Sequence, residues 1–202
     1  MNIVKSPVWL RWLLPHLTWH HSRHEKIIYL TFDDGPIPDV TPQVLNILKK
    51  YNIQASFFCV GENIVKHPEI FEQLKTEGHR IGNHTFNHLK GWDTSLKEYL
   101  ENVEKCHQYT QSTLFRPPYG KCTPSQFKQL RKQYNIIMWD IITYDFDTQL
   151  SPEDCYHNAV QYTTNGSIVV FHDNVKALPR LLYALPKAIE YWLAAGYAFR
   201  TL

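Results

Sequence analysis

Several features that mark particular classes of protein are missing from this sequence. The 202 residues contain no CxxC pair, no internal repeat, no linker and no low-complexity segment. The chain also lacks a strong net charge: the formal value is +2 with neutral histidines, which argues against a nucleic-acid protein that binds by bulk electrostatics. What remains is an ordinary globular composition, with 44% hydrophobic residues and a length that fits one domain with a sizeable core.

The amino terminus lacks the features of a secretory signal or a membrane span. The apolar stretch at residues 8–14 is interrupted by Arg11 and ended by Pro15, and no Ala-x-Ala cleavage site follows it. It is also too short to cross a bilayer, so no transmembrane segment is expected. We expect residues 1–25 to be a lead segment whose amphipathic helix packs on the domain. A membrane-surface anchor is the alternative, which the small basic face disfavours.

The four cysteines show no pairing pattern. We expect Cys59, Cys106, Cys122 and Cys155 to be free thiols, which points to a reducing compartment. This favours a cytoplasmic location, with a membrane-associated or envelope location as the alternative.

Strand-like and helical patterns alternate from residue 26 to the end of the chain. The expected strands cover residues 26–32, 54–60, 79–83, 113–116, 135–140, 167–171 and 197–201. The expected helices cover residues 41–51, 69–76, 96–109, 123–134, a segment from 151, and 179–195. Thr41, Thr123 and Ser151 each precede a proline and are the expected helix starts.

This alternation predicts an α/β protein of parallel strands with crossover helices. An open doubly wound sheet and a closed barrel both satisfy the pattern. Polar motifs follow the carboxyl ends of many different strands, whereas an open sheet would concentrate them at one switch point. The distribution therefore favours a barrel.

Two adjacent carboxylates, Asp33 and Asp34, stand where the first strand ends. Like charges side by side are costly unless something positive lies near them, and a metal ion is the obvious partner. His84 and His88 are four residues apart, which places them on one face of a helical turn with the spacing of zinc-binding pairs. One carboxylate and two imidazoles make a three-ligand site with room for water. Taken alone, the two histidines could equally be helix-capping or surface residues.

Five segments, in order, resemble the motifs of the polysaccharide deacetylase family, the metal-dependent carbohydrate esterases with the NodB homology domain (carbohydrate esterase family 4). They are residues 31–35, 84–88, 116–120, 139–146 and 168–173. The resemblance covers roughly residues 26–202, which we take as the catalytic domain. It implies a single-domain distorted (β/α)7 barrel of the TIM-like kind.

The resemblance also implies roles for the residues that match the motifs. It assigns Asp34, His84 and His88 to one divalent metal ion, with Zn²⁺ as the first choice and Co²⁺, Ni²⁺ or Mn²⁺ as alternatives. It makes Asp33 the general base, and it makes Arg116 the residue that pairs with Asp33 and orients it.

The later motifs supply the remaining roles. By resemblance His172 protonates the leaving amine, and we choose Asp145 as its carboxylate partner, with Asp140 as second choice. The backbone amide of Tyr119 is a candidate donor to the developing oxyanion. Phe146 would form an apolar wall that meets the acetyl group or the sugar.

The sequence departs from the family pattern at three of these positions. Ile142 stands where an acid is often found, Phe146 where Trp is usual, and Val170 where Leu is common. These changes leave the proposed mechanism intact but put the identity of the substrate in doubt.

The sequence thus predicts a hydrolase that removes N-acetyl groups, with O-acetyl as the second choice, from an amino-sugar polymer or oligomer such as peptidoglycan or a chitin-like glycan. A hydrolase of the same fold that acts on a non-sugar C–N amide is the main alternative. A silent carbohydrate-binding module is a remote one. An iron oxygenase with two histidines and one carboxylate is disfavoured, because its usual order keeps one His and the acid close together. No nucleic-acid partner is expected.

Overall fold

The computed structural model describes residues 3–202, so the first two residues of the predicted lead segment lie outside the described residues. Its α-helices are α1 (Val8–Leu13), α2 (Thr41–Lys50), α3 (Gly61–Lys66), α4 (Pro68–Thr76), α5 (Leu96–Thr110), α6 (Pro124–Leu130), α7 (Pro152–Val160) and α8 (Leu178–Ala194). Its strands are β1 (Ile27–Asp33), β2 (Ser56–Cys59), β3 (Arg80–Asn83), β4 (Leu114–Phe115), β5 (Asn135–Ile136), β6 (Ile141–Ile142), β7 (Ser167–His172) and β8 (Ala198–Phe199). Short 3-10 turns cover Gly91–Asp93 and Pro118–Gly120.

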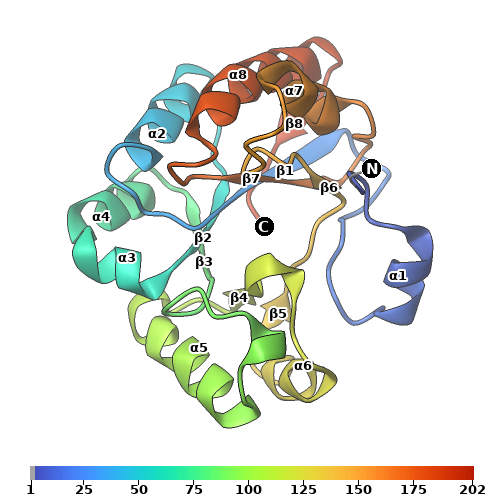
Figure 1. The fold of residues 1–202 in the computed structure, drawn as a ribbon. Helices are drawn as coiled ribbons and strands as arrows, with labels where there is room; N and C mark the ends of the chain where they lie inside the picture. Colours follow the sequence, from blue (N-terminus) through green and yellow to red (C-terminus); the bar gives the residue numbers. More distant parts are fainter. Residues whose placement is uncertain (1–2) are drawn as a thin grey trace.

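The strands form one parallel sheet that curls around the centre of the molecule, with the helices on the outside (Figure 1). Along the sheet the order is β5-β4-β3-β2-β1-β7-β6, and β8 pairs with the first residues of β1. The curled sheet runs from β5 at one edge to β6 at the other. The predicted distorted (β/α)7 barrel is confirmed.

The register of the strands aligns their carboxyl ends on one side of the sheet. Asp33, the last residue of β1, lies opposite His172, the last residue of β7. On the other side of β1, Asp33 lies opposite Phe58, and the next residue, Cys59, lies opposite Asn83 at the end of β3. Because parallel strands that start together end together, residues that directly follow β1, β3 and β7 meet at the same rim.

The predicted helix starts are right in two of three cases. Thr123 and Gln126 form a capping box at α6, and the Ser151 hydroxyl accepts a hydrogen bond from the Asp154 amide at α7. Thr41, however, lies inside α2, whose N-cap is Val40. Its hydroxyl is used in a tertiary contact, described below.

The predicted strand at residues 135–140 is wrong in its length: only Asn135–Ile136 is a strand, β5, and β6 follows at Ile141–Ile142 on the opposite edge of the sheet. The lead segment lies between them. Thr18 forms a bridge to Ile137, and Lys5 forms a bridge to Ile141. The lead segment therefore completes the barrel wall with its own backbone hydrogen bonds, which apolar periodicity in residues 135–140 could not reveal.

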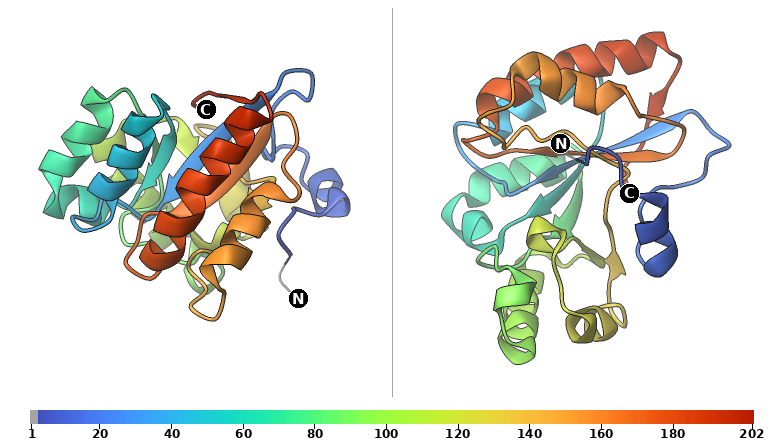
Figure 2. Two further views of the ribbon diagram at one scale, coloured as in Figure 1. Left: turned by 90° about the horizontal axis from the view of Figure 1, so that it is seen from above. Right: turned by 45° about the vertical axis from the view of Figure 1, so that its right-hand side comes forward.

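Helix α1, within the lead segment, contacts the rest of the chain through one side only. None of its residues is buried, and only Leu10 of the helix and Leu14 after it pack against an apolar cluster. Figure 2 shows α1 standing at the side of the molecule. Within residues 3–202 no helix is long and apolar enough to span a membrane.

The four cysteines are free and buried. Burial raises the pKa of the Cys106 and Cys122 thiols to about 12. The expectation of free thiols is confirmed. Because side chains shield all four from solvent, their free state does not report on the redox compartment, and the cytoplasmic location stays a prediction.

Candidate active site

The motif segments meet around one cavity of about 750 Å³ at the carboxyl ends of the strands. Its lining includes most of the predicted site residues: Asp33, Asp34, His84, His88, Tyr119, Phe146 and His172. A second cavity of about 770 Å³ lies near the amino ends of β2 and β3. Its lining includes His79 and Glu77, but among residues 3–202 the one group of three ligand-type side chains is in the first cavity.

Asp34, His84 and His88 converge on a single point in this cavity. Their ligand atoms all lie within 4.8 Å of one another. Asp34 Oδ1 lies 3.1 Å from His88 Nε2 and 3.7 Å from His84 Nε2. That oxygen is buried and accepts no hydrogen bond in the protein. A buried carboxylate oxygen without a partner, facing two imidazole nitrogens, suits a divalent cation with mixed N and O ligands.

Hydrogen bonding and burial prepare His84 to act as a ligand. Its Nδ1 lies 2.7 Å from the Arg116 carbonyl oxygen, which accepts the Nδ1–H and leaves the Nε2 lone pair facing Asp34. Burial lowers the pKa of His84 to about 4, against the opposing charges of Asp33 and Asp34, so the ring is neutral at pH 7. For Asp34, burial raises the pKa, but the contact with His88 and the charges of the neighbouring histidines outweigh it and bring the pKa well below its usual range.

The His84–His88 segment reaches this geometry without the helical turn that its spacing suggested. Residues 84–88 form a loop after β3, and Thr85 and His88 have positive φ values of 65° and 55°. The expectation that the two rings share a helix face is therefore wrong, although the rings do meet, with centroids 5.1 Å apart. The loop after β3, rather than a helical turn, brings the two rings together.

Left-handed backbone is concentrated at this cavity. Among residues 3–202, seven non-glycine residues have positive φ, and five of them lie in the motif loops: Asp34, Thr85, His88, Tyr119 and Tyr144. Such conformations cost on the order of 1–3 kcal/mol each and persist where the surroundings enforce them. Their clustering is typical of a site whose side chains are held for a function.

Asp33 lies beside the predicted metal ligands and is held by Arg116. Arg116 Nη1 donates to Asp33 Oδ1 at 2.7 Å and to the Thr31 hydroxyl at 2.9 Å. Its other nitrogens donate to the carbonyls of Ile137 and Met138, at 3.2 Å and 2.9 Å. Arg116 is fully buried and each of its three side-chain nitrogens has a fixed partner, so the guanidinium can orient one carboxylate oxygen of Asp33.

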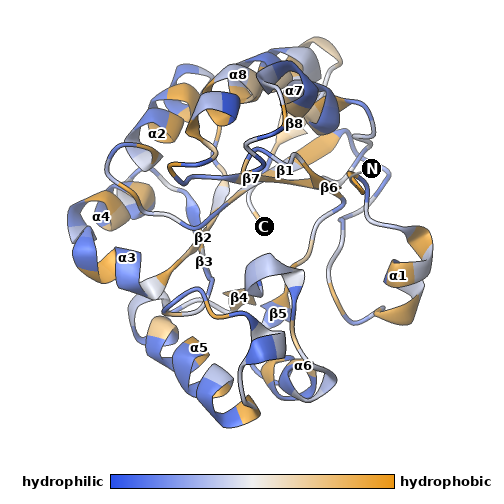
Figure 3. Cartoon of the chain, in the orientation of Figure 1, coloured by the Kyte–Doolittle hydropathy of each residue, from blue (hydrophilic) through white to orange (hydrophobic). Residues whose placement is uncertain are grey.

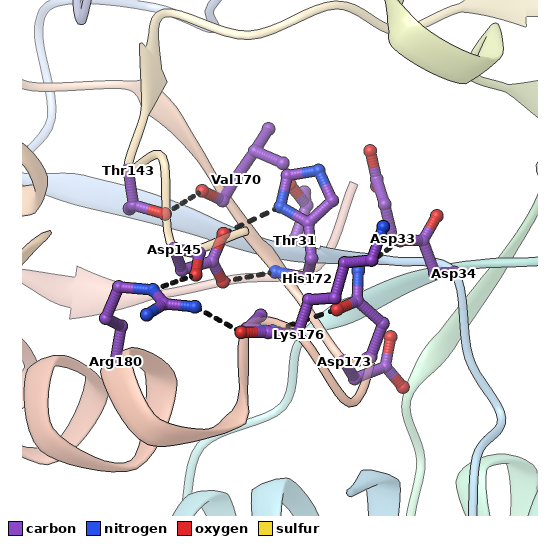
Figure 4. A network of polar contacts seen from close by, with 12 residues as sticks. Thr31, Asp33, Asp34, Thr143, Asp145, Val170, His172, Asp173, Lys176 and Arg180 are labelled. Atoms are coloured by element: carbon purple, nitrogen blue, oxygen red, sulfur yellow. Dashed lines mark hydrogen bonds and ion pairs between the residues drawn. The ribbon is translucent and has the colours of Figure 1, made fainter. Parts of the chain in front are cut away.

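His172 and Asp145 form the second buried pair (Figure 4). His172 Nδ1 lies 2.8 Å from Asp145 Oδ1, and the His172 amide donates to Asp145 Oδ2 at 2.6 Å. Arg180 Nε donates to the Asp145 carbonyl at 2.5 Å and so holds this loop against α8. Burial lowers the pKa of His172, but the charge and hydrogen bond of Asp145 outweigh it and raise the pKa to about 9. His172 is therefore protonated at pH 7.

Asp140, the second choice for this pairing, is occupied elsewhere. Its carboxylate accepts hydrogen bonds from Arg23 at 2.9 Å and from the Ser167 hydroxyl at 2.6 Å. Arg11 lies 3.4 Å from its other oxygen. Asp140 thus anchors the lead segment, while Asp145 is the carboxylate at His172.

Replacing Asp145 by Asn tests this pairing through the pH profile. With the charge in place, His172 stays protonated until the pH rises through about 9. Without it, burial dominates and the pKa of His172 falls. The alkaline limb of kcat/KM is then expected to move to lower pH by at least about one unit, the usual size of a close-charge effect.

The control for this measurement is Asp147→Asn, which removes a nearby carboxylate that accepts a hydrogen bond from the Gln149 amide. Its alkaline limb should stay near that of the unaltered protein. An unmoved limb in Asp145→Asn would mean that another group titrates in that range.

Two site residues escaped the sequence reasoning. Asp173 accepts hydrogen bonds from the Thr41 hydroxyl at 2.6 Å and from the Gly35 amide at 3.0 Å, and burial raises its pKa to about 8. A Cβ on Gly35 would overlap this carboxylate, so glycine is needed in the turn after Asp34. Asp173 therefore holds the turn that follows the aspartate pair. The signal was its place directly after His172 in a motif.

Asn174 is the second missed residue, and it contacts the proposed ligand carboxylate directly. Its Nδ2 donates to Asp34 Oδ2 at 2.6 Å, and its Oδ1 accepts from the Ala177 amide at 2.9 Å. Both ends of the side-chain amide are thus engaged. Because Oδ2 is occupied, Asp34 presents Oδ1 to the two histidines.

We expect Asn174→Ala to weaken divalent-metal affinity by roughly 10- to 100-fold, the usual effect of losing such an outer hydrogen bond. Isothermal titration of the metal-free protein measures this directly. Asn174→Asp is the matched control, because it keeps the acceptor for Ala177 but cannot donate to Asp34. Weakening in both variants assigns the effect to the donated hydrogen bond, whereas weakening in Asn174→Ala alone would assign it to the start of α8.

The three residues that depart from the family pattern, Ile142, Phe146 and Val170, all line the cavity. Phe146 packs its ring against His172 with centroids 4.8 Å apart, and Tyr119, 60% exposed, does the same against His88 at 4.8 Å. The departures therefore shape the space that a substrate would enter.

Comparisons with known proteins agree with this geometry. The family model described as polysaccharide deacetylase matches residues 20–139. A peptidoglycan-N-acetylglucosamine deacetylase of Bacillus cereus is 35% identical over 194 residues, which cover 93% of this chain and 91% of the relative. The peptidoglycan-N-acetylmuramic acid deacetylase PdaA of Bacillus subtilis is 31% identical, over 88% of this chain and 70% of its own. A crystal structure of a peptidoglycan N-acetylglucosamine deacetylase superposes with a TM-score of 0.90 and 30% identity, covering 98% of this chain and 95% of the other.

Proposed function

The chain belongs to the polysaccharide deacetylase family, and from that premise we propose that it hydrolyses N-acetyl groups on an amino-sugar polymer or oligomer, with the aid of one divalent metal ion. The observation that carries this proposal is the meeting of three units around one cavity. They are the Asp34, His84 and His88 cluster, the Asp33–Arg116 pair, and the His172–Asp145 pair. A ligand set, a base and an acid are the parts that amide hydrolysis needs.

In the proposed reaction, Asp34, His84 and His88 would hold the metal. When bound there, a divalent ion would polarise the acetyl carbonyl and make water more acidic. Zn²⁺ is the first choice for two imidazoles and one carboxylate, and Co²⁺, Ni²⁺ and Mn²⁺ remain alternatives.

The protein's own groups would move the protons. Asp33, oriented by Arg116, would take a proton from the attacking water. His172, protonated at pH 7 and tethered through Nδ1 to Asp145, would give the Nε2 proton to the departing amine. The backbone amide of Tyr119, at the rim of the cavity, is the proposed donor to the oxyanion.

The names of the relatives support a peptidoglycan-type substrate with N-acetylglucosamine or N-acetylmuramic acid. Chitin-like glycans and O-acetyl groups remain within the proposal, and a non-sugar amide is the alternative. Ile142, Phe146 and Val170, which line the cavity, are the residues that we expect to decide among these substrates.

The experiment is an acetate-release assay of the metal-reconstituted protein against peptidoglycan fragments, chitooligosaccharides and acetyl xylan. We expect release from the first two classes, with more from the peptidoglycan fragments. Release from acetyl xylan alone would replace N-deacetylation by O-deacetylation. No release from any glycan, together with hydrolysis of a small non-sugar amide, would favour the alternative.

A further inference from the structure

Helix α1 turns its apolar side outward, as its orange outer segments in Figure 3 illustrate. Four of its side chains are between 59% and 81% exposed, and all four are apolar: Val8, Trp9, Trp12 and Leu13. They recur at positions that share one side of a helix. The one charged residue of the helix, Arg11, is turned inward to the buried Asp140. A helix that faces only water carries its polar side outward, so this orientation points to an apolar or interfacial environment.

The surroundings of this outward face of α1 are basic. Leu10 and Leu14 pack against the same apolar cluster as Phe127 and Leu130 of α6, so both helices lie over that cluster. Residues 3–24 and 121–135, which contain them, hold seven of the chain's 21 Lys and Arg residues and none of its 19 Asp and Glu residues. Two of the seven, Arg11 and Arg23, pair with Asp140, which leaves five basic residues without that partner. Exposed on or directly after α6 are Lys128, Arg131 and Lys132. Lys128, Arg131 and Lys132 therefore supply the basic charge that the exposed side of α1 itself lacks.

We propose that the outward face of α1 and the basic residues of α6 form a docking surface for an anionic lipid bilayer. Tryptophan side chains favour the boundary between headgroups and acyl chains, and apolar residues of an interfacial helix enter that boundary. Lys and Arg beside them attract acidic headgroups. Charge complementarity selects this occupant over a second copy of the chain, because two copies would bring two basic regions together.

The lead segment that carries α1 also contacts a residue of the cavity lining. The Tyr144 hydroxyl, whose ring lines the cavity, donates to the carbonyl of Ile3 at 3.2 Å. Ile3 is 62% exposed and lies five residues before α1. The docking itself is independent of the proposed reaction.

The apolar part of the proposal is tested by co-sedimentation with vesicles of phosphatidylcholine alone and of equimolar phosphatidylcholine and phosphatidylglycerol. We expect binding to the acidic vesicles, and at least a tenfold weaker partition for the double variant Trp9→Ser/Trp12→Ser, roughly the effect of losing two buried aromatic side chains. The matched control, Tyr191→Ser/Leu193→Ser, removes exposed apolar side chains from α8 and should bind like the unaltered protein.

The basic part is tested by Arg131→Glu/Lys132→Glu, expected to weaken binding to acidic vesicles roughly tenfold or more. Lys49→Glu/Lys50→Glu makes the same change of net charge on α2 and should have little effect. The proposal is overturned if the unaltered protein does not bind acidic vesicles. It is also overturned if the Trp9→Ser/Trp12→Ser variant binds them as strongly as the unaltered protein. A third contrary outcome is a dimer in size-exclusion chromatography that the Trp9→Ser/Trp12→Ser substitutions abolish, with no binding to vesicles. Far-ultraviolet circular dichroism and thermal unfolding of all four variants check that they are folded.

Discussion

His84→Ala is expected to lose its metal ion and its activity together while the protein stays folded. His84 is buried, with one ring nitrogen fixed by the Arg116 carbonyl and the other facing Asp34. Removing it leaves only Asp34 and His88, too few ligands to hold one ion tightly. Metal content of the purified variant, measured by atomic absorption, should fall from one ion per chain to near zero. Activity should fall with it, by the several orders of magnitude that separate metal-assisted from unassisted hydrolysis.

The matched control is His79→Ala, which also removes a buried histidine. His79 lies near the other cavity, where its Nδ1 accepts a hydrogen bond from the Ala55 amide at 3.1 Å. The two variants should lose comparable stability, because each leaves a buried space and an unpaired polar group. Only His84→Ala should lose metal. Equal metal content in both variants would remove Asp34, His84 and His88 from the proposed site.

Asp33→Asn is expected to keep its metal and lose most of its turnover. Asp33 is 3% exposed and accepts the Arg116 Nη1 hydrogen bond, which the Asn carbonyl can also accept. The variant therefore keeps the shape and the partner but lacks the basic oxygen. General base catalysis is typically worth on the order of 10²–10⁴-fold, so kcat should fall by about that factor. Single-turnover measurements on the metal-loaded variant separate this loss from any change in substrate binding.

Asp33→Asn is also expected to lower the stability of the protein, because the buried Arg116 guanidinium loses its counter-charge. Such a loss costs on the order of 3–5 kcal/mol when a pair is fully broken, and less when a neutral acceptor remains. The thermal midpoint of the variant should therefore be recorded beside its activity. A well-folded variant with one metal ion and nearly normal turnover would contradict the role of Asp33 as base. The pH profile of Asp145→Asn tests the role of His172 as the acid independently of these measurements.

The amino-acid sequence by itself determined the parts of this site whose signals are local. An apolar run that stops at Asp33 and Asp34 indicates a buried strand with carboxylates at its end, and the structure places β1 there. The alternation of strand and helix patterns indicated parallel strands with crossover helices, and polar motifs at the ends of many strands favoured the barrel. The family resemblance implied that Arg116 pairs with Asp33 and that His172 is the acid, for which Asp145 was the first choice of partner, and each pair is in direct contact.

Tertiary structure alone decided the features that join distant residues. Asn174 reaches Asp34 across 140 positions, and the lead segment separates β5 from β6 through bridges such as Thr18 to Ile137. The proposed docking of α1 on a bilayer depends also on the basic residues of α6, which are more than a hundred positions away in the sequence. Periodicity records which side of an element is apolar. It does not record what lies against that side, because each such contact depends on how the whole chain closes around the barrel.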